Sequence, residues 1–210
     1  MKVSFDRSNR PTVRRALARA LLGVAAAGVL PLAALAGGSS YGGDEHTDHD
    51  RHSGTLTSPL VERVHDLNQR YVDINVALHK EKGWVVGTPC VTGPDHGAMG
   101  FHIVNPGRLA DGILDPEYPE ALIYEPLPNG SFRLVGVEFI QDKADWDARN
   151  PNGPPPSLDG NLMNLVGEPN RYGLHAFYEL HVWAFEDNPQ GAFVDWNNHV
   201  TCESTTKAPR

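Results

Sequence analysis

Residues 120–140, EALIYEPLPNGSFRLVGVEFI, contain two apolar runs separated by the dipeptide Asn129-Gly130. Asn-Gly is the dipeptide most typical of a two-residue β-hairpin turn, because both residues tolerate the positive φ that this turn needs. With a turn of two residues, Tyr124 pairs with Val135 on the facing strand. The stretch therefore predicts an antiparallel hairpin at the centre of the fold.

The predicted register divides this hairpin into two faces. One face is entirely apolar and comprises Leu122, Tyr124, Val135, Val137 and Phe139. The other comprises Ala121, Ile123, Leu134, Gly136, Glu138 and Ile140. Glu138 therefore lies on a mostly apolar face, where a carboxylate costs free energy unless something pairs with it. Its small neighbours, Ala121 and Gly136, are expected to leave space beside it, so Glu138 is a candidate functional residue.

Further short runs rich in β-branched and aromatic residues predict more strands. They are WVVGTPCV (84–91), MGFHIV (99–104), AFYELHVWAF (176–185) and GAFVDW (191–196). Before them, Ser58-Pro59 begins an apolar stripe of helical spacing that extends to Gly83. The Pro- and Gly-rich segment 149–173 predicts a long connection with one helical turn at 162–166. Strands joined by turns indicate an α+β fold, in which an N-terminal amphipathic helix packs on an antiparallel β-sheet or small barrel.

Residues 1–36 have the pattern of a secretory signal peptide. Basic residues precede the apolar run 20–35, and the segment ends in the small-x-small sequence 34–36. A membrane anchor is the alternative, but the run is shorter than the roughly 20 apolar residues that a span needs. We expect a secreted or periplasmic protein without stable membrane insertion after cleavage. Export would use the Sec route or, through Arg14-Arg15, the twin-arginine route.

Residues 37–57 are rich in Gly, Ser and His and contain almost nothing apolar, which predicts a disordered linker. A weak metal-scavenging tail is the alternative interpretation of its histidines. Residues 58–210 are then expected to form a single domain. The formal net charge of −8 argues against nucleic acid and against anionic membrane surfaces as partners.

Cys90 and Cys202 are the two cysteines of the chain, and both lie in the part that would be exported. In an oxidising compartment they are expected to form a disulfide. The alternative is a thiolate metal site, which their wide separation and the lack of a C-x-x-C pattern disfavour.

The histidines of the predicted strands point to metal chemistry. His181 shares a strand face with Glu179, Trp183 and Phe185, while His102 lies in another strand and His96 lies in the Gly-rich loop before it. Imidazole and carboxylate ligands together suit Zn, Mn, Fe or Cu. We therefore predict that His102, Glu138 and His181 share a cavity that binds a divalent transition metal, with His96 at its rim. The alternatives are buried histidines that bond to backbone or to the glutamates, and a salt bridge of Glu138.

Two other functions fit the same residues. Glu179, Trp183 and Phe185 would line an aromatic pocket of a non-catalytic binding module for a small apolar ligand. Glu138 with Glu179 would form the paired carboxylates of a hydrolase. The leading hypothesis remains an exported metal-binding protein, with a metalloenzyme of undetermined substrate as its more specific form and a small molecule or metal ion as its partner.

Several stretches together resemble a group of uncharacterised exported bacterial proteins. They are CVTGPDHGAMGFHIVNP (90–106), PEALIYEP (119–126), RLVGVEFI (133–140), NRYGLHAFYELHVWAFEDNPQGAFVDWN (170–197) and VTC (200–202). The resemblance implies an exported single domain with one disulfide, and it implies no activity. Asn197-Asn198 stands where the pattern would have Asn-Pro, which concerns only the last turn.

Overall fold

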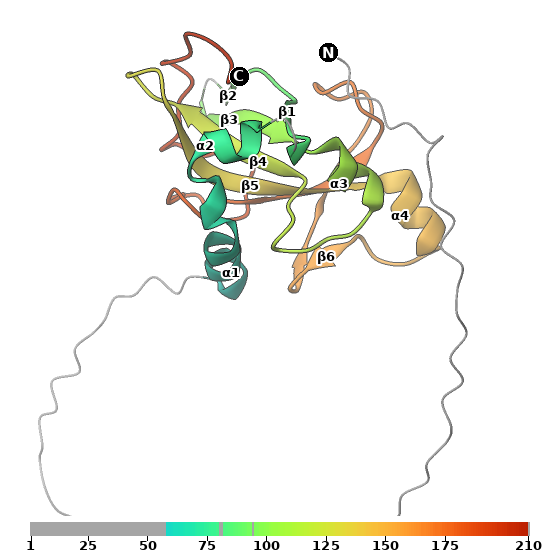
Figure 1. Cartoon of the computed structure of the whole chain (residues 1–210). Helices are drawn as coiled ribbons and strands as arrows, with labels where there is room; N and C mark the ends of the chain where they lie inside the picture. Colours follow the sequence, from blue (N-terminus) through green and yellow to red (C-terminus); the bar gives the residue numbers. More distant parts are fainter. Residues whose placement is uncertain (1–57, 80–81, 94, 210) are drawn as a thin grey trace, which may run out of the picture. The chain divides into compact units, whose positions relative to one another are not determined.

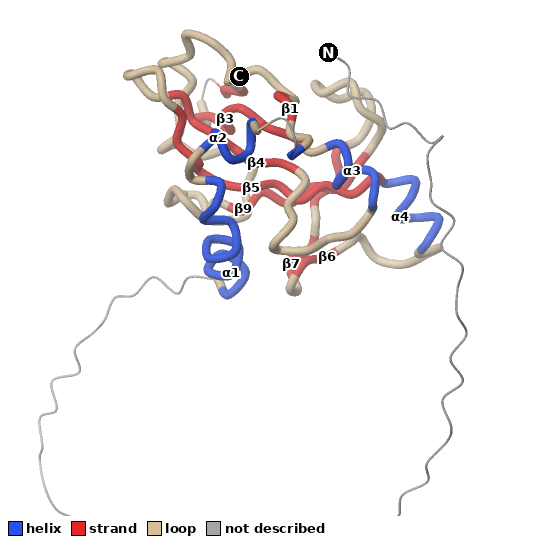
Figure 2. The backbone as a smooth tube through the Cα atoms, in the orientation of Figure 1, coloured by secondary structure: helices blue, strands red, loops and turns tan. Residues whose placement is uncertain are grey.

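The computed structural model describes residues 58–79, 82–93 and 95–209. The predicted signal peptide (1–36) and His-rich linker (37–57) lie outside the described residues. The described part is an antiparallel β-sheet with short helices packed against it, which confirms the predicted α+β class (Figure 1, Figure 2).

The sheet has seven strands in the order β1-β3-β4-β5-β9-β8, and β2 also pairs with β3. The strands are β1 (Val85–Val86), β2 (Val91–Gly93), β3 (Gly97–Val104), β4 (Ala121–Pro126), β5 (Phe132–Asp142), β8 (Asn164–Val166) and β9 (Phe177–Val182). Within the described residues this path does not close on itself, so the sheet is open and is not a barrel. The four long strands β3, β4, β5 and β9 form its centre.

The central hairpin joins β4 to β5 through a longer turn than the sequence predicts. The Gly130 N–H donates to the Leu127 carbonyl over 2.9 Å, and the Leu127 N–H donates to the Ser131 carbonyl over 2.9 Å, so the turn has three residues. Gly130 has a φ of 80°, which glycine adopts without strain. The extra turn residue pairs Tyr124 with Leu134, and the predicted pairing with Val135 is wrong.

A bulge in β5 restores the predicted register beyond this point. The register shifts between Ile123 and Tyr124, after which Ala121 lies opposite Glu138 as predicted. Because the bulge lies at Leu134 and Val135, these two residues exchange the faces expected for them. Leu134 joins the main core with Tyr124, while Val135 packs on the opposite face.

The main core lies between one face of the sheet and the N-terminal helices. In place of one predicted helix, the chain forms α1 (Pro59–Asn68), a 3-10 turn η1 (Gln69–Tyr71) and α2 (Ile74–Leu78). The break has a local cause, because the Asp73 side chain accepts a hydrogen bond from the Asn75 N–H and so starts a new helix. Leu60, Val64 and Tyr71 still pack on the sheet, and the Tyr124 hydroxyl donates to the Tyr71 carbonyl over 2.6 Å.

Loops and one short helix cover the other face of the sheet. Leu109 of α3 (Pro106–Asp111) and the half-buried Tyr172 and Leu174 pack on this face near β3 and β9. Farther along the face, Val200 packs beside Val135. This face carries the predicted site.

Two predictions for the second half of the chain are wrong, and one helix there was not predicted. The predicted helical turn at 162–166 is wrong, because β6 (Ser157–Leu158) pairs with β7 (Asn161–Leu162) and β8 joins the sheet. The short helix α4 (Lys143–Arg149) was not predicted. The run 191–196 is not a strand, because it folds back so that the Ala192 and Val194 carbonyls accept hydrogen bonds from the backbone N–H and the indole N–H of Trp183.

Cys90 and Cys202 form the predicted disulfide, with their Cα atoms 5.8 Å apart and 112 positions between them in the sequence. The bond joins the segment before β2 to the C-terminal segment. Such bonds are typical of proteins that reach an oxidising compartment. Among the described residues, no helix combines the length and the apolar character that a membrane span requires.

Candidate metal centre

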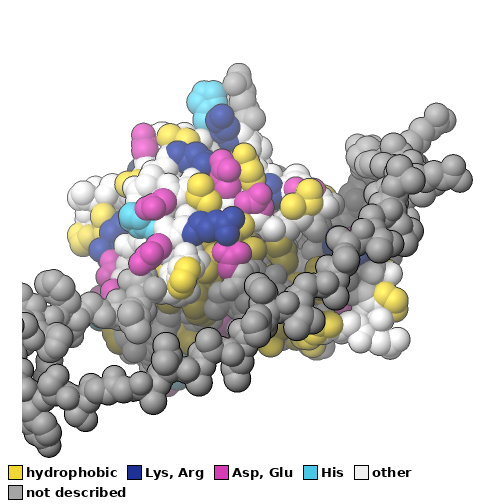
Figure 3. Space-filling view, turned by 90° about the horizontal axis from the view of Figure 1, so that it is seen from below, with side chains coloured by type: hydrophobic (Ala, Val, Ile, Leu, Met, Phe, Trp, Pro, Cys, Tyr) yellow, Lys and Arg dark blue, Asp and Glu magenta, His cyan; other side chains and the backbone are white. Residues whose placement is uncertain are grey.

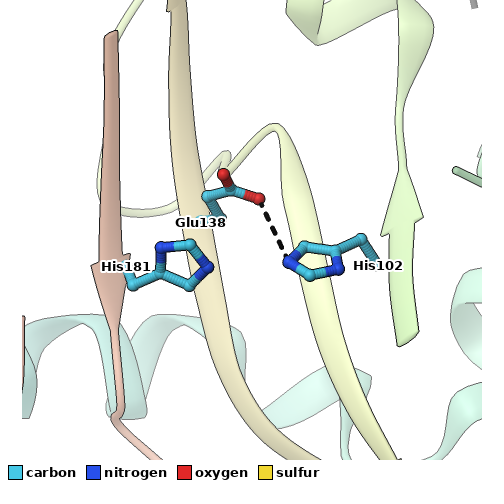
Figure 4. A group of neighbouring side chains, drawn as sticks. All are labelled: His102, Glu138 and His181. Atoms are coloured by element: carbon cyan, nitrogen blue, oxygen red, sulfur yellow. Dashed lines mark ion pairs between the residues drawn. The ribbon is translucent and has the colours of Figure 1, made fainter. Parts of the chain in front are cut away.

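His102, Glu138 and His181 come from three strands of the central sheet. The pairing of β5 with β9 places Glu138 directly opposite His181. His102 lies on β3 opposite Ile123 of β4, and Glu138 lies opposite the fully buried Ala121 of the same strand. The imidazole of His102 therefore reaches the carboxyl group of Glu138 diagonally across β4. Figure 4 shows the three side chains on one face of the sheet, with the two imidazole rings turned toward each other.

The three side chains are close enough to share an ion. Their potential ligand atoms all lie within 4.8 Å of one another. His102 Nε2 is 3.6 Å from Glu138 Oε2, and the ring centres of His102 and His181 are 5.8 Å apart with the planes nearly perpendicular. Atoms bonded to one ion at about 2.1 Å are about 3–4 Å apart, so small side-chain rotations would complete such a site.

Burial makes both imidazoles neutral. It lowers the pKa of His181 to about 4, and burial together with the nearby His181 lowers the pKa of His102 to about 3. Burial and the neighbouring Glu179 carboxylate raise the pKa of Glu138 well above its usual value. The 3.6 Å contact of His102 with Glu138 is therefore not a salt bridge near neutral pH. A neutral imidazole is the form that binds a metal.

One nitrogen of His102 is already engaged. Its Nδ1 lies 3.0 Å from the Thr88 hydroxyl oxygen, which also accepts a hydrogen bond from the His102 backbone N–H over 3.3 Å. This contact orients the ring so that Nε2 faces Glu138 and His181. A hydrogen bond of this kind to the outer nitrogen is typical of metal-binding histidines.

The remaining nitrogens of the two rings are buried without hydrogen-bond partners among the described residues. They are His102 Nε2, His181 Nδ1 and His181 Nε2. Most buried polar side-chain atoms have a partner, and an unsatisfied one costs about 1–3 kcal/mol. The interpretation of His181 as a buried histidine bonded to backbone or to a glutamate therefore finds no support in its contacts.

A second group of ligand types adjoins the first and shares His181 with it. Glu179, His181 and Asp195 also have potential ligand atoms within 4.8 Å of one another, and His181 Nδ1 is 3.8 Å from Asp195 Oδ1. Glu179 is buried beside Glu138, and burial raises the pKa of Glu179 to about 7. The sequence carries no signal for Asp195, which lies in a run predicted to be a strand, or for Thr88, because no pattern marks a single threonine.

His96 is not part of this cluster. It is exposed in the turn before β3 and lies six positions before His102. Neither the group His102, Glu138 and His181 nor the lining of the adjacent cavity includes His96. The prediction that His96 lies at the rim of the cavity is therefore wrong, because its loop is at the far end of the strand.

Trp183 and Phe185 lie on different sides of the sheet. The Trp183 ring stacks on His181 with the ring centres 6.2 Å apart, as their shared face predicts. Phe185 instead packs in the main core, with its ring centre 5.1 Å from that of His65. The alternation ends because β9 stops at Val182, whose carbonyl accepts a hydrogen bond from the Ala184 N–H.

A cavity of about 60 Å³ borders the cluster on the side of α3. His102, Glu138, Thr88 and Tyr172 contribute its polar atoms, and Gly87 completes its backbone edge. Its apolar wall consists of Val104, Leu109, Ile140, Leu174 and Phe177. The predicted pocket walled by Trp183 and Phe185 is not observed, since neither residue lines this cavity.

No protein-family model matches the chain, and neither a curated protein nor a solved structure is significantly similar to it. Its function is therefore inferred from the geometry of the site.

Proposed function

We propose that the protein is an exported metal-binding protein in which His102, Glu138 and His181 bind one divalent transition metal. The observation that carries this proposal is the state of His181, which is 1% exposed and has no hydrogen-bond partner for either ring nitrogen among the described residues. A metal ion bonded to one of these nitrogens would compensate for its burial. The neutral rings of His102 and His181 already have the protonation state that a metal needs.

The donor set narrows the choice of metal. Two imidazole nitrogens and one carboxylate suit Zn, Mn, Fe or Cu better than Ca or Mg, which prefer oxygen ligands. Three protein ligands also leave at least one position of the ion open, as in catalytic metal centres. A metalloenzyme is therefore the more specific form of the proposal.

Export and partners follow the same proposal. The Cys90–Cys202 disulfide supports an oxidising destination, and a signal peptide at 1–36 would direct the chain there. Basic and acidic side chains are interspersed on the face drawn in Figure 3, and no continuous basic surface is visible there. This supports a metal ion or small molecule as the partner rather than a nucleic acid.

The size of the cavity weighs against the other two functions. A cavity of about 60 Å³ is much smaller than the 150 Å³ cavity that admits benzene, so an aromatic-sized apolar ligand does not fit. A sugar ring is larger still, which argues against a paired-carboxylate glycosidase that uses Glu138 and Glu179. The carboxyl pair is better explained as support for the metal ligand Glu138.

Elemental analysis of the exported protein, purified without chelators, tests the proposal. We expect about one transition-metal ion per chain, and we expect the His181→Gln variant to lose at least about 100-fold in affinity, since even a supporting residue costs 10–100-fold. The His96→Gln variant is the matched control, because His96 is an exposed histidine outside the cluster. The histidines of the 37–57 segment are present in all these proteins, so differences between them report on the cluster.

Two results would refute the metal site. One is a wild-type protein that retains no ion after reconstitution with Zn, Mn, Fe and Cu in turn. The other is a His181→Gln variant that binds as tightly as the wild type.

A further inference from the structure

We propose that the metal centre takes an exogenous ligand of the dioxygen type, meaning a weakly polar molecule of two or three non-hydrogen atoms, which binds the ion from the adjacent cavity. This inference rests on the proposed metal-binding function and adds the class of molecule on which that centre would act.

The cavity lies directly beside the candidate metal ligands. His102 and Glu138 are candidate metal ligands and also form part of the cavity wall. An ion held by three protein atoms has open coordination positions. A molecule in the cavity would therefore contact the ion directly, without passing through another layer of side chains.

The volume of the cavity bounds the size of the ligand. At about 60 Å³ it is less than half the size of the 150 Å³ cavity that admits benzene. The space therefore favours molecules of two or three non-hydrogen atoms over rings and branched molecules.

The wall of the cavity bounds the polarity of the ligand. Apart from the two ligand residues, five apolar side chains form most of the wall. The polar atoms that remain are already engaged, because the Thr88 hydroxyl contacts His102 and the Tyr172 hydroxyl lies 3.6 Å from Met99 Sδ. A strongly hydrated anion would lose its water without gaining new partners, so a weakly polar molecule is favoured.

An outer groove adjoins the cavity. This groove of about 370 Å³ lies between the segment 87–92 and the pair Arg171-Tyr172. It shares Gly87, Thr88 and Tyr172 with the inner cavity, so these three residues separate the inner space from the outer one.

The test uses the full-length exported protein loaded with Fe(II) without oxygen, and nitric oxide as a probe of dioxygen size. We expect nitric oxide to give the EPR signal of a high-spin iron–nitrosyl complex. We expect imidazole, a five-membered ring, not to compete with it. The signal reports binding and requires no knowledge of a reaction.

Substitutions of Leu174 can make the cavity either smaller or larger. It is half-buried in the cavity wall, and its backbone is held by the side chain of Asn170. Leu174→Trp should fill the cavity and weaken nitric oxide binding at least tenfold at an unchanged iron content. Leu174→Ala should enlarge the cavity and let imidazole compete. Leu165→Trp is the control, since Leu165 is 55% exposed on β8 and does not line the cavity.

The outcomes separate this inference from the metal proposal. Iron-loaded wild type that does not bind nitric oxide overturns the inference and leaves the metal site intact. Equal nitric oxide binding by wild type and a folded Leu174→Trp variant also overturns it. Failure of the wild type to bind iron while it binds Zn, Mn or Cu overturns the inference alone, and failure to bind any of the four metals removes both proposals. If Leu174→Trp does not fold, imidazole competition in Leu174→Ala but not in Leu165→Trp supports the cavity as the binding place.

Discussion

His181 and Glu179 lie on the same strand face, and burial shifts their pKa values in opposite directions. Each is at most 3% exposed, so each is forced toward its neutral form. For His181 the neutral form is the unprotonated ring, and for Glu179 it is the protonated carboxyl group. Burial therefore lowers the pKa of His181 to about 4 and raises that of Glu179 to about 7. A metal ion binds the neutral imidazole, so the lowered pKa of His181 favours binding. A carboxyl group of the pair that bound the ion would first have to lose its proton.

The Glu179 shift predicts a pH-dependent stability of the metal-free protein. The folded-state pKa of about 7 exceeds the usual 4.5, so the folded protein keeps a proton that the unfolded chain releases between these values. The stabilisation is complete below pH 4.5 and is lost as the pH rises through 7. The wild type should lose unfolding free energy as the pH rises from 5 to 8. We expect this loss to be smaller in Glu179→Gln, by up to about 3 kcal/mol. Urea titrations with chelator present would measure it.

The buried histidines act with the opposite sign and must be separated from this effect. Their lowered pKa values make stability complete above pH 6.5 and reduce it as the pH falls toward 4. Both proteins contain the two histidines, so the difference between wild type and variant reports on the Glu138–Glu179 carboxyl pair. Parallel pH profiles of the two proteins would contradict the assignment.

At the scale of the elements, strand β3 needs a glycine at the point where the C-terminal segment crosses it. Gly97 has a φ of 82°, and a Cβ atom at this position would lie 2.1 Å from the Asn197 carbonyl oxygen. Close by, Ala98 and Asn197 form a bridge through two backbone hydrogen bonds. The start of β3 therefore holds the segment that carries Asp195 to the site.

Gly97→Ala should destabilise the protein more than the same change in the hairpin turn. Gly130 has a similar φ of 80°, but no atom lies within 4 Å of a Cβ built there. Gly130→Ala should cost about 1–2 kcal/mol from backbone strain alone, and Gly97→Ala should cost at least about 2 kcal/mol more because of the clash. Chemical denaturation of both variants measures the difference. Equal losses would show that the crossing segment moves aside without cost.

At the scale of the whole molecule, the C-terminal segment closes the face that carries the site. The disulfide ties Cys202 to Cys90, and the buried Glu125 accepts a hydrogen bond from the Thr201 N–H over 2.9 Å. Glu125 is in turn paired with Arg133. These contacts lie at the end of a long chain segment that forms no strand of its own.

Removal of the disulfide should therefore have a large effect. The bond closes a loop of 112 positions, for which the chain-entropy model gives about 4–5 kcal/mol. We expect the double variant Cys90→Ala, Cys202→Ala to lose about 2–5 kcal/mol of unfolding free energy relative to the oxidised wild type. Wild type measured with a reductant is the control and should show a similar loss. An unchanged urea midpoint in the double variant would contradict this role of the bond.

Much of the fold follows from short-range patterns in the sequence. Alternation along 120–126 and 177–183 predicts the buried faces, and the turn residues predict antiparallel pairing. The alternation of side chains along each strand places Glu138 and His181 on the less uniformly apolar face of their strands. The disulfide follows from the number of cysteines and the expected destination.

Only the tertiary structure decides which of these residues meet. The neighbour relation of β5 and β9 brings Glu138 opposite His181, although 43 positions separate them, and no local pattern encodes that pairing. The bulge at Val135, the end of β9 at Val182 and the return of Asp195 onto the sheet all depend on contacts between distant segments. Local periodicity specifies the face on which a side chain lies. The identity of its neighbours, and with it the site, depends on how strands far apart in the sequence pack together.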